Sequence, residues 1–151
     1  MIRTLLATAA IVIGIVAVAA QSEPIIKQRN GLMASMWKDG LAPAYRMAKG
    51  REPFDEPKVE AGLAKMTEIV TQLPPLWPPN SKPPAKPNTK YSSSLKIWDN
   101  KPDFDAKLAK LAESIKESRG KAKNLDSVKT IVTNINQNCD NCHEAYQVRN
   151  Q

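Results

Sequence analysis

The chain has 151 residues, enough for one domain and hardly for two. Its formal net charge is +7, but the lysines are spread along the whole chain without a run of five, and aromatic residues are few. This pattern disfavours a nucleic-acid-binding protein. It indicates solvated helix faces, whose positive charge would favour acidic partners during encounter.

Residues 1–20 have the features of a secretory signal peptide. Arg3 supplies a minimal positive start, residues 5–18 are apolar, and residues 18–20 are small enough for cleavage. The alternative is an uncleaved anchor, which the short apolar run disfavours because a span prefers about 20 residues. We therefore expect a signal peptide over 1–20, a mature domain over 21–151, export to the periplasm, and no stable membrane span after cleavage.

Apolar residues at three- and four-residue spacing predict a first helix over 22–48. Ser22 can cap this helix, and Pro24 suits its first turn. Gly50 and Pro53 are expected to end it.

A second helix is predicted over 57–73, where a clean apolar stripe ends at Pro74 and Pro75. Residues 76–95 contain five further prolines, a density that excludes a helix. A loop of this length is unusual inside a small domain, so we expect it to cross the end of the fold. The residues expected to hold it down are Trp77, Tyr91 and Trp98.

A third helix is predicted over 99–119, with Asp99 as its cap, Pro102 in its first turn and Gly120 after its last. No strand pattern of any length is evident.

A fourth helix is predicted over 125–148, capped by Asn124 or Asp126. Four amphipathic helices with short first and third connections predict an all-α protein, an antiparallel four-helix bundle with a long Pro-rich loop between helices 2 and 3.

The most informative motif is C-x-x-C-H at residues 139–143, the attachment signature of a c-type haem. Cys139, Cys142 and His143 are spaced i, i+3 and i+4, so one face of the fourth helix presents all three side chains. A disulfide, a thiol redox pair and half of a zinc site are the alternatives. No βαβ pattern accompanies the cysteines, and the chain has no other Cys or His to complete a zinc site, so haem is favoured.

A single histidine excludes bis-histidine ligation within this chain, which leaves Met, Lys, water or an empty position opposite His143. Among the mature methionines, Met66 belongs to a regular core stripe and Met47 lies near the end of the first helix. Met33 and Met36 are one turn apart, so both can face a haem. Each can equally be core filler, since thioether side chains suit irregular gaps.

Arg29 lies four residues before Met33, on the same helix face. It can neutralise a haem propionate through a charge-assisted pair, or it can be a solvated arginine near the helix start. Side chains expected either near the porphyrin or in the general core are Trp37, Phe104, Leu108 and Tyr146.

Three stretches carry a resemblance to a known family: residues 139–144 with Tyr146, residues 90–98 (Lys-Tyr-Ser-Ser-Ser-Leu-Lys-Ile-Trp), and residues 32–33 (Leu-Met). With these, the chain resembles the cytochrome c′ family, and it looks closest to the low-spin cytochromes c-556. The similarity covers essentially all of the mature chain.

The resemblance implies one haem c bonded to Cys139 and Cys142, with His143 as the proximal iron ligand. In the c-556 branch a methionine of the first helix is the distal ligand, and the matching residue is Met33. Gln147 stands where the family often has a basic residue.

We expect a one-electron carrier rather than an enzyme, because a Met and His pair leaves no open position on the iron. The alternative is a five-coordinate haem protein that binds NO or CO, as in the high-spin members of the family. The expected partners are redox proteins of unknown identity, with the chain a monomer or a homodimer.

Overall fold

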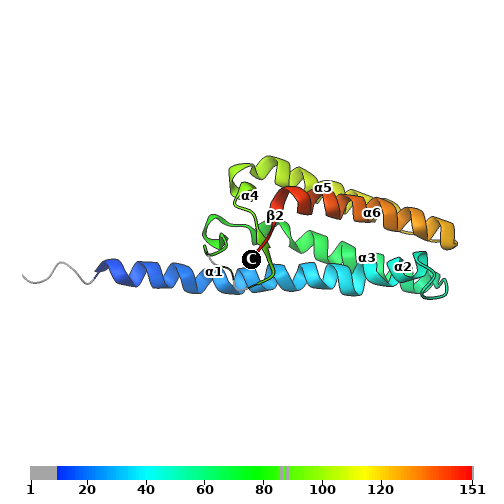
Figure 1. Ribbon diagram of the computed structural model, residues 1–151, viewed down its shortest axis with the longest axis horizontal. Coiled ribbons are helices and arrows are strands. Elements are labelled where there is room, and N and C mark those ends of the chain that lie inside the picture. The colour runs from blue at the N-terminus through cyan, green and yellow to red at the C-terminus, as the bar shows by residue number, and fades with distance from the viewer. Residues whose placement is uncertain (1–9, 86, 88, 151) are drawn as a thin grey trace, which may run out of the picture.

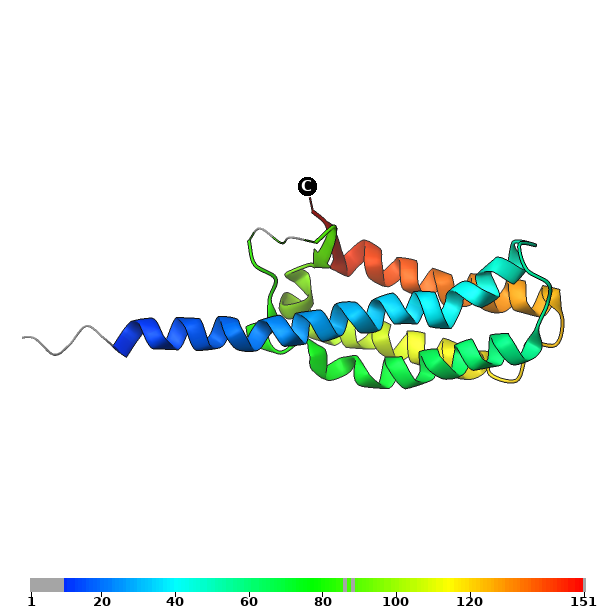
Figure 2. The ribbon, with the colours of Figure 1, turned by 90° about the horizontal axis from the view of Figure 1, so that it is seen from below.

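The computed structural model describes residues 10–85, 87 and 89–150, so the first nine residues of the predicted signal peptide (residues 1–20) lie outside them. In the described part, no helix has the length and apolar character that a membrane crossing requires. Figures 1 and 2 show long helical rods packed side by side, with the start of the first rod projecting beyond the others. The predicted all-α four-helix bundle is confirmed.

The first rod is a continuous helix in three parts. It comprises the α-helix α1 (Ala10–Ser35), the π-helical segment η1 (Met36–Leu41) and the α-helix α2 (Ala42–Ala48). The predicted start at Ser22 is wrong, because the segment ahead of it is itself helical and Pro24 lies inside α1. The predicted end is correct: Gly50 follows with φ of 69°, a left-handed conformation that favours glycine.

The second rod, α3 (Glu56–Gln72), runs antiparallel to the first and begins at Asp55, whose side chain accepts a hydrogen bond of 3.0 Å from the Lys58 N–H. The two rods cross closely where Gly40 of η1 meets Gly62 of α3. A Cβ atom at Gly62 would collide with the Gly40 carbonyl oxygen, and a Cβ atom at Gly40 would collide with Met66. Paired glycines therefore set the distance between these helices.

The Pro-rich segment crosses the bundle end, as predicted, and contains two 3₁₀ turns, η2 (Pro74–Leu76) and η3 (Pro79–Ser81). Trp77 is buried and donates to Ser93 Oγ at 3.3 Å, while Trp98 donates to the Pro78 carbonyl at 3.0 Å. Both tryptophans hold this segment as expected. The Tyr91 side chain is not buried against the bundle in the same way, since 42% of the residue is exposed.

The third predicted helix is divided into α4 (Lys96–Asp99) and α5 (Lys101–Ser118). The break lies at Asn100, which occupies the N-cap position of α5 with φ of −134°, so the predicted cap at Asp99 is wrong. Pro102 is in the first turn of α5, and Gly120 follows its end with φ of 73°, both as expected.

The fourth rod is α6 (Leu125–Tyr146), and the cap is Asn124. Its side chain accepts from the Ser127 N–H at 2.9 Å, and Ser127 Oγ accepts from the Asn124 N–H at 3.0 Å, a reciprocal capping box. α6 packs against α5 along its length and against α2 at the far end of the bundle (Figure 2).

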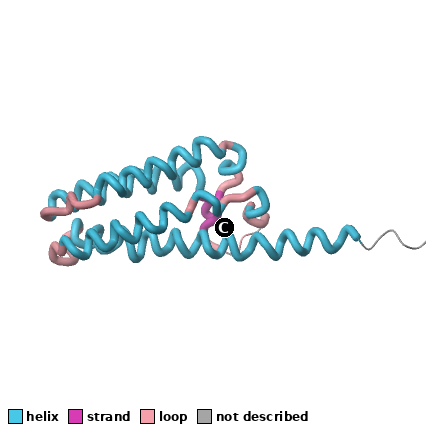
Figure 3. The backbone as a smooth tube through the Cα atoms, turned by 180° about the vertical axis from the view of Figure 1, so that it is seen from behind, coloured by secondary structure: helices cyan, strands magenta, loops and turns pink. Residues whose placement is uncertain are grey.

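A short two-stranded ladder was not predicted. The fourth helix ends at Tyr146, and the next residues form β2 (Gln147–Arg149), which pairs antiparallel with β1 (Tyr91–Ser93) (Figure 3). The loop causes this early end, because the Ser94 N–H donates to the Tyr146 carbonyl at 2.8 Å. The ladder fixes the Pro-rich segment across the end of α6.

Candidate functional site

α6 carries the attachment motif at its C-terminal end. The buried face of the helix, which includes Val128, Val132 and Ile135, continues through Cys139, Cys142 and Tyr146. Both cysteines are free thiols and half-buried. The predicted arrangement on one helix face is therefore present in the fold.

Burial keeps both thiols and the imidazole uncharged. It raises the pKa of Cys139 to about 11, assisted by the charges of Asp140 and Cys142, and it raises the pKa of Cys142. His143 is exposed as a residue, yet the part of its ring against the protein is desolvated, which lowers its pKa although Asp140 opposes the shift. At neutral pH its imidazole has a lone pair available.

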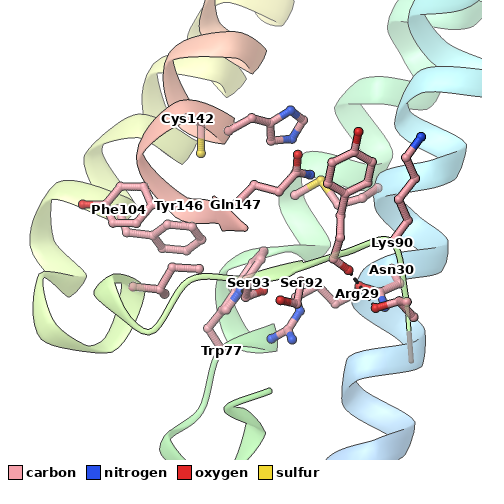
Figure 4. A pocket seen from close by; sticks show the side chains of 15 residues that line it. Arg29, Asn30, Trp77, Lys90, Ser92, Ser93, Phe104, Cys142, Tyr146 and Gln147 are labelled. Carbon is pink, nitrogen blue, oxygen red and sulfur yellow. Dashed lines mark hydrogen bonds between the residues drawn. The ribbon is translucent and has the colours of Figure 1, made fainter. Parts of the chain in front are cut away.

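Two adjoining hollows lie between α6 and the first rod. The first holds about 360 Å³ and is bordered by the ladder strand β1; the second holds about 300 Å³ and is lined mainly by apolar side chains. Three residues line both hollows: Met33 of α1, with Cys142 and His143 of α6. We call the two hollows together the slot. In Figure 4, Cys142 points into it from α6 and Arg29 enters from α1.

The methionines are sorted by their place around the slot. Met33 is half-buried and borders both hollows, whereas Met36 (5% exposed) and Met66 (0% exposed) border only the apolar one. Met47 lies in the core and lines neither hollow.

Arg29 is not the solvated arginine that sequence reasoning left open, because only 2% of it is exposed. Its guanidinium lies 5.3 Å from the centre of the Trp77 ring, and Nη1 donates to the Leu76 carbonyl at 3.1 Å. Burial lowers the pKa of Arg29 to about 10, so at neutral pH the side chain is a buried cation. Its buried Nε–H donor has no hydrogen-bond partner in the described structure.

An aromatic wall closes the slot on the α5 side. The Phe104 ring meets Trp77 at 4.7 Å and Tyr146 at 5.3 Å between ring centres, both edge to face. Tyr146 donates to Asp103 at 2.6 Å. The sequence predicted four side chains near the porphyrin or in the general core, and all four line the slot: Trp37, Phe104, Leu108 and Tyr146. The hydrogen bond from Tyr146 to Asp103 was not predicted, although a buried tyrosine hydroxyl generally needs a hydrogen-bond partner.

Strand β1 forms the last border of the slot, and its residues were not expected there. Tyr91, Ser92 and Ser93 line the first hollow, together with Lys90, which precedes the strand (Figure 4). Among the residues that the structure describes, no group of three or more His, Cys, Asp or Glu side chains could hold a metal ion.

A family model described as Cytochrome C' matches residues 24–147. The chain is 33% identical over 147 residues to cytochrome c-556 of Rhodopseudomonas palustris and 32% identical over 147 residues to cytochrome c-555 of Bradyrhizobium diazoefficiens; each alignment covers 97% of both chains. The structure resembles that of cytochrome c′ from Rhodopseudomonas palustris with a TM-score of 0.76 and 30% identity, over 84% of this chain and 98% of that one. This chain therefore belongs to the cytochrome c′ family, whose members bind a single covalently attached haem c.

Proposed function

We propose that this protein is an exported one-electron carrier whose haem c is bonded to Cys139 and Cys142 and ligated by His143 and Met33. One observation carries the proposal: Met33 and His143, from two different helices, border the same two hollows. The family model begins at residue 24, just after the predicted signal peptide, which supports a domain over 21–151 and a periplasmic location.

The chain's own groups fit a haem. Free thiols at Cys139 and Cys142 suit covalent attachment, and the neutral imidazole of His143 suits iron ligation. The buried Nε of Arg29 lacks a partner in the described structure, as expected of a donor reserved for a bound anion.

The two hollows differ in polarity, which favours one orientation of the cofactor. The first contains Arg29 together with the hydroxyls of Ser92 and Ser93 and would take the propionates. The second is lined by Leu108, Leu111 and the thiol of Cys139 and would enclose the apolar edge.

When bound, the haem iron supplies one-electron oxidation and reduction. The Met33 thioether is a soft ligand, so it would favour the ferrous state and raise the reduction potential relative to harder ligands. The apolar wall would keep water from the iron and raise the potential further. With His143 and Met33 both bound to the iron, the site would leave no position open for a substrate.

The second candidate function is that of a five-coordinate, gas-binding protein. It is favoured by the apolar hollow beside Met33, which offers space for a small ligand if the thioether does not reach the iron. The chain is also 30% identical over 139 residues to a Rhodopseudomonas palustris protein named cytochrome c′.

Carbon monoxide separates these two functions. We expect the reduced holoprotein to bind carbon monoxide poorly, and a Met33→Leu variant to bind it readily with a change in the visible spectrum. A Met36→Leu variant is the matched control, since Met36 borders the slot in the same helical rod. Ready binding by the unmodified protein would overturn the carrier proposal in favour of the gas-binding one.

A further inference from the structure

The first hollow of the slot opens to solvent beside the β1–β2 ladder. The residues that both line it and are exposed are Asn30, Thr89, Lys90, Tyr91, His143 and Gln147. They come from α1, from β1 and the residues before it, from the end of α6 and from the start of β2. We call this rim the slot mouth, and a cofactor in the slot would approach solvent there.

Tyr91 is the large apolar residue of the mouth. It lines the slot although 42% of it is exposed, an arrangement that leaves much of an aromatic ring in water. Tyrosine is enriched at protein interfaces because its ring buries apolar area while its hydroxyl stays polar.

Two cations flank this ring. Lys90 Nζ lies 5.4 Å from the Tyr91 ring centre. Arg149 is the ladder partner of Tyr91, so both residues lie on the same face of the two-stranded ribbon. We call Lys90, Tyr91 and Arg149 the ribbon triplet.

No acidic side chain adjoins the triplet in the sequence or pairs with it in the described structure. Residues 89–93 and 147–150 contain no carboxylate, and neither Lys90 nor Arg149 is in an ion pair within the described structure. The nearest acidic residue in sequence is Glu144, on α6 and exposed. Carboxylates on the surface of a partner protein could therefore pair with Lys90 and Arg149.

The ribbon also holds these residues in place. The Asn150 N–H donates to the Lys90 carbonyl at 3.0 Å, its amide donates to the Thr89 carbonyl at 2.6 Å, and Ser92 Oγ donates to Asn150 Oδ1 at 3.1 Å. Residues that are already held in place lose little conformational entropy on binding, so this surface favours association.

We propose that the ribbon triplet is the docking surface for an electron-transfer protein whose contact face is acidic, with Tyr91 as the central apolar contact. The inference rests on the proposed electron-carrier function and adds the kind of partner and the place where it binds. The two cations steer the acidic face towards the slot mouth, and Tyr91 is buried in the complex.

Stopped-flow reduction of the ferric holoprotein by fully reduced flavodoxin, a small acidic flavoprotein, tests this surface. The test variant combines Lys90→Glu with Arg149→Glu. The control combines Lys116→Glu, in the last turn of α5, with Lys121→Glu, just after that helix; both lysines are exposed and the net charge is the same. This end of α5 lies away from the β1–β2 ladder (Figure 2). At about 0.01 M ionic strength, where the Debye length is about 30 Å, we expect the test variant to react about tenfold more slowly than the control. At about 1 M salt the difference should vanish.

Variants of Tyr91 provide a second test of the docking surface. In the same assay Tyr91→Ala should slow the reaction even at high salt, whereas Tyr91→Phe, which keeps the ring, should not. Equal rates for the two double variants at low salt would overturn the proposal, and so would equal rates for Tyr91→Ala and Tyr91→Phe. Carbon monoxide binding by the unmodified protein is scored separately, so a failure of the ligation proposal is distinguishable from a failure of the docking surface.

Discussion

Tyr146, near the end of α6, donates a hydrogen bond of 2.6 Å to the carboxylate of Asp103 in the first turn of α5. The bond joins the helix that carries the attachment motif to its neighbour, three residues after His143. This bond, with burial and the charge of Asp103, raises the pKa of Tyr146 to about 12. The fold therefore favours the neutral phenol.

Replacing Tyr146 by Phe keeps the packing on Phe104 and removes the donor. We expect the free energy of unfolding in urea at pH 7 to fall by about 1–2 kcal/mol. Because the folded-state pKa exceeds the unfolded value of about 10, this contribution is complete below pH 10 and is lost as the pH rises through 12. The difference between the two proteins should shrink over that range. A difference in unfolding free energy that stays constant from pH 10 to 12 would contradict the account. Tyr45→Phe is the control, because the Tyr45 hydroxyl makes no hydrogen bond in the described structure.

Gly62→Ala tests the close crossing of α3 with η1. The added Cβ would meet the Gly40 carbonyl oxygen, which belongs to the backbone and cannot turn aside. We expect a loss of about 1–3 kcal/mol in thermal or urea unfolding, despite the better helix propensity of alanine. Gly31→Ala is the matched control. With nothing within 4 Å of its Cβ, it should gain up to about 1 kcal/mol. An unchanged stability for Gly62→Ala would refute the close crossing.

Arg29→Gln tests whether a buried cation acts on the haem. Arg29 lines the first hollow, so its charge would lie on the order of 10 Å from a bound iron, and at an effective dielectric constant near 20 its removal should lower the midpoint potential by about 40–90 mV. Redox titration with mediators measures this shift. Arg46→Gln removes a cation from a surface pair with Glu52 and should leave the potential nearly unchanged. Equal shifts in the two variants would mean that Arg29 has no special place at the haem.

Much of the fold follows from local chemistry that the sequence displays. The caps at Asn124, Gly50 and Gly120 act within a few residues, so these three helix ends could be predicted from the sequence. The spacing of Cys139, Cys142 and His143 likewise predicts their common helix face.

What escaped sequence reasoning depends on partners far apart in the chain. Arg29 is buried because the Leu76 carbonyl, 47 positions away, accepts its hydrogen bond. The early end of α6 depends on Ser94, and the Asp103 contact joins residues 43 positions apart. No local periodicity reports such pairings, and only the folded chain reveals the two glycines that face each other across a helix crossing.

The central claim, that Met33 and His143 hold the iron between them, is tested most directly by proton NMR of the reduced holoprotein with isotope-labelled methionine methyl groups. A thioether bound to the iron places its methyl group over the haem ring, where the ring current shifts its resonance far upfield. We predict one such resonance, absent from Met33→Leu and retained in Met36→Leu. If it persists in Met33→Leu, or is missing from the unmodified protein, Met33 is not the ligand.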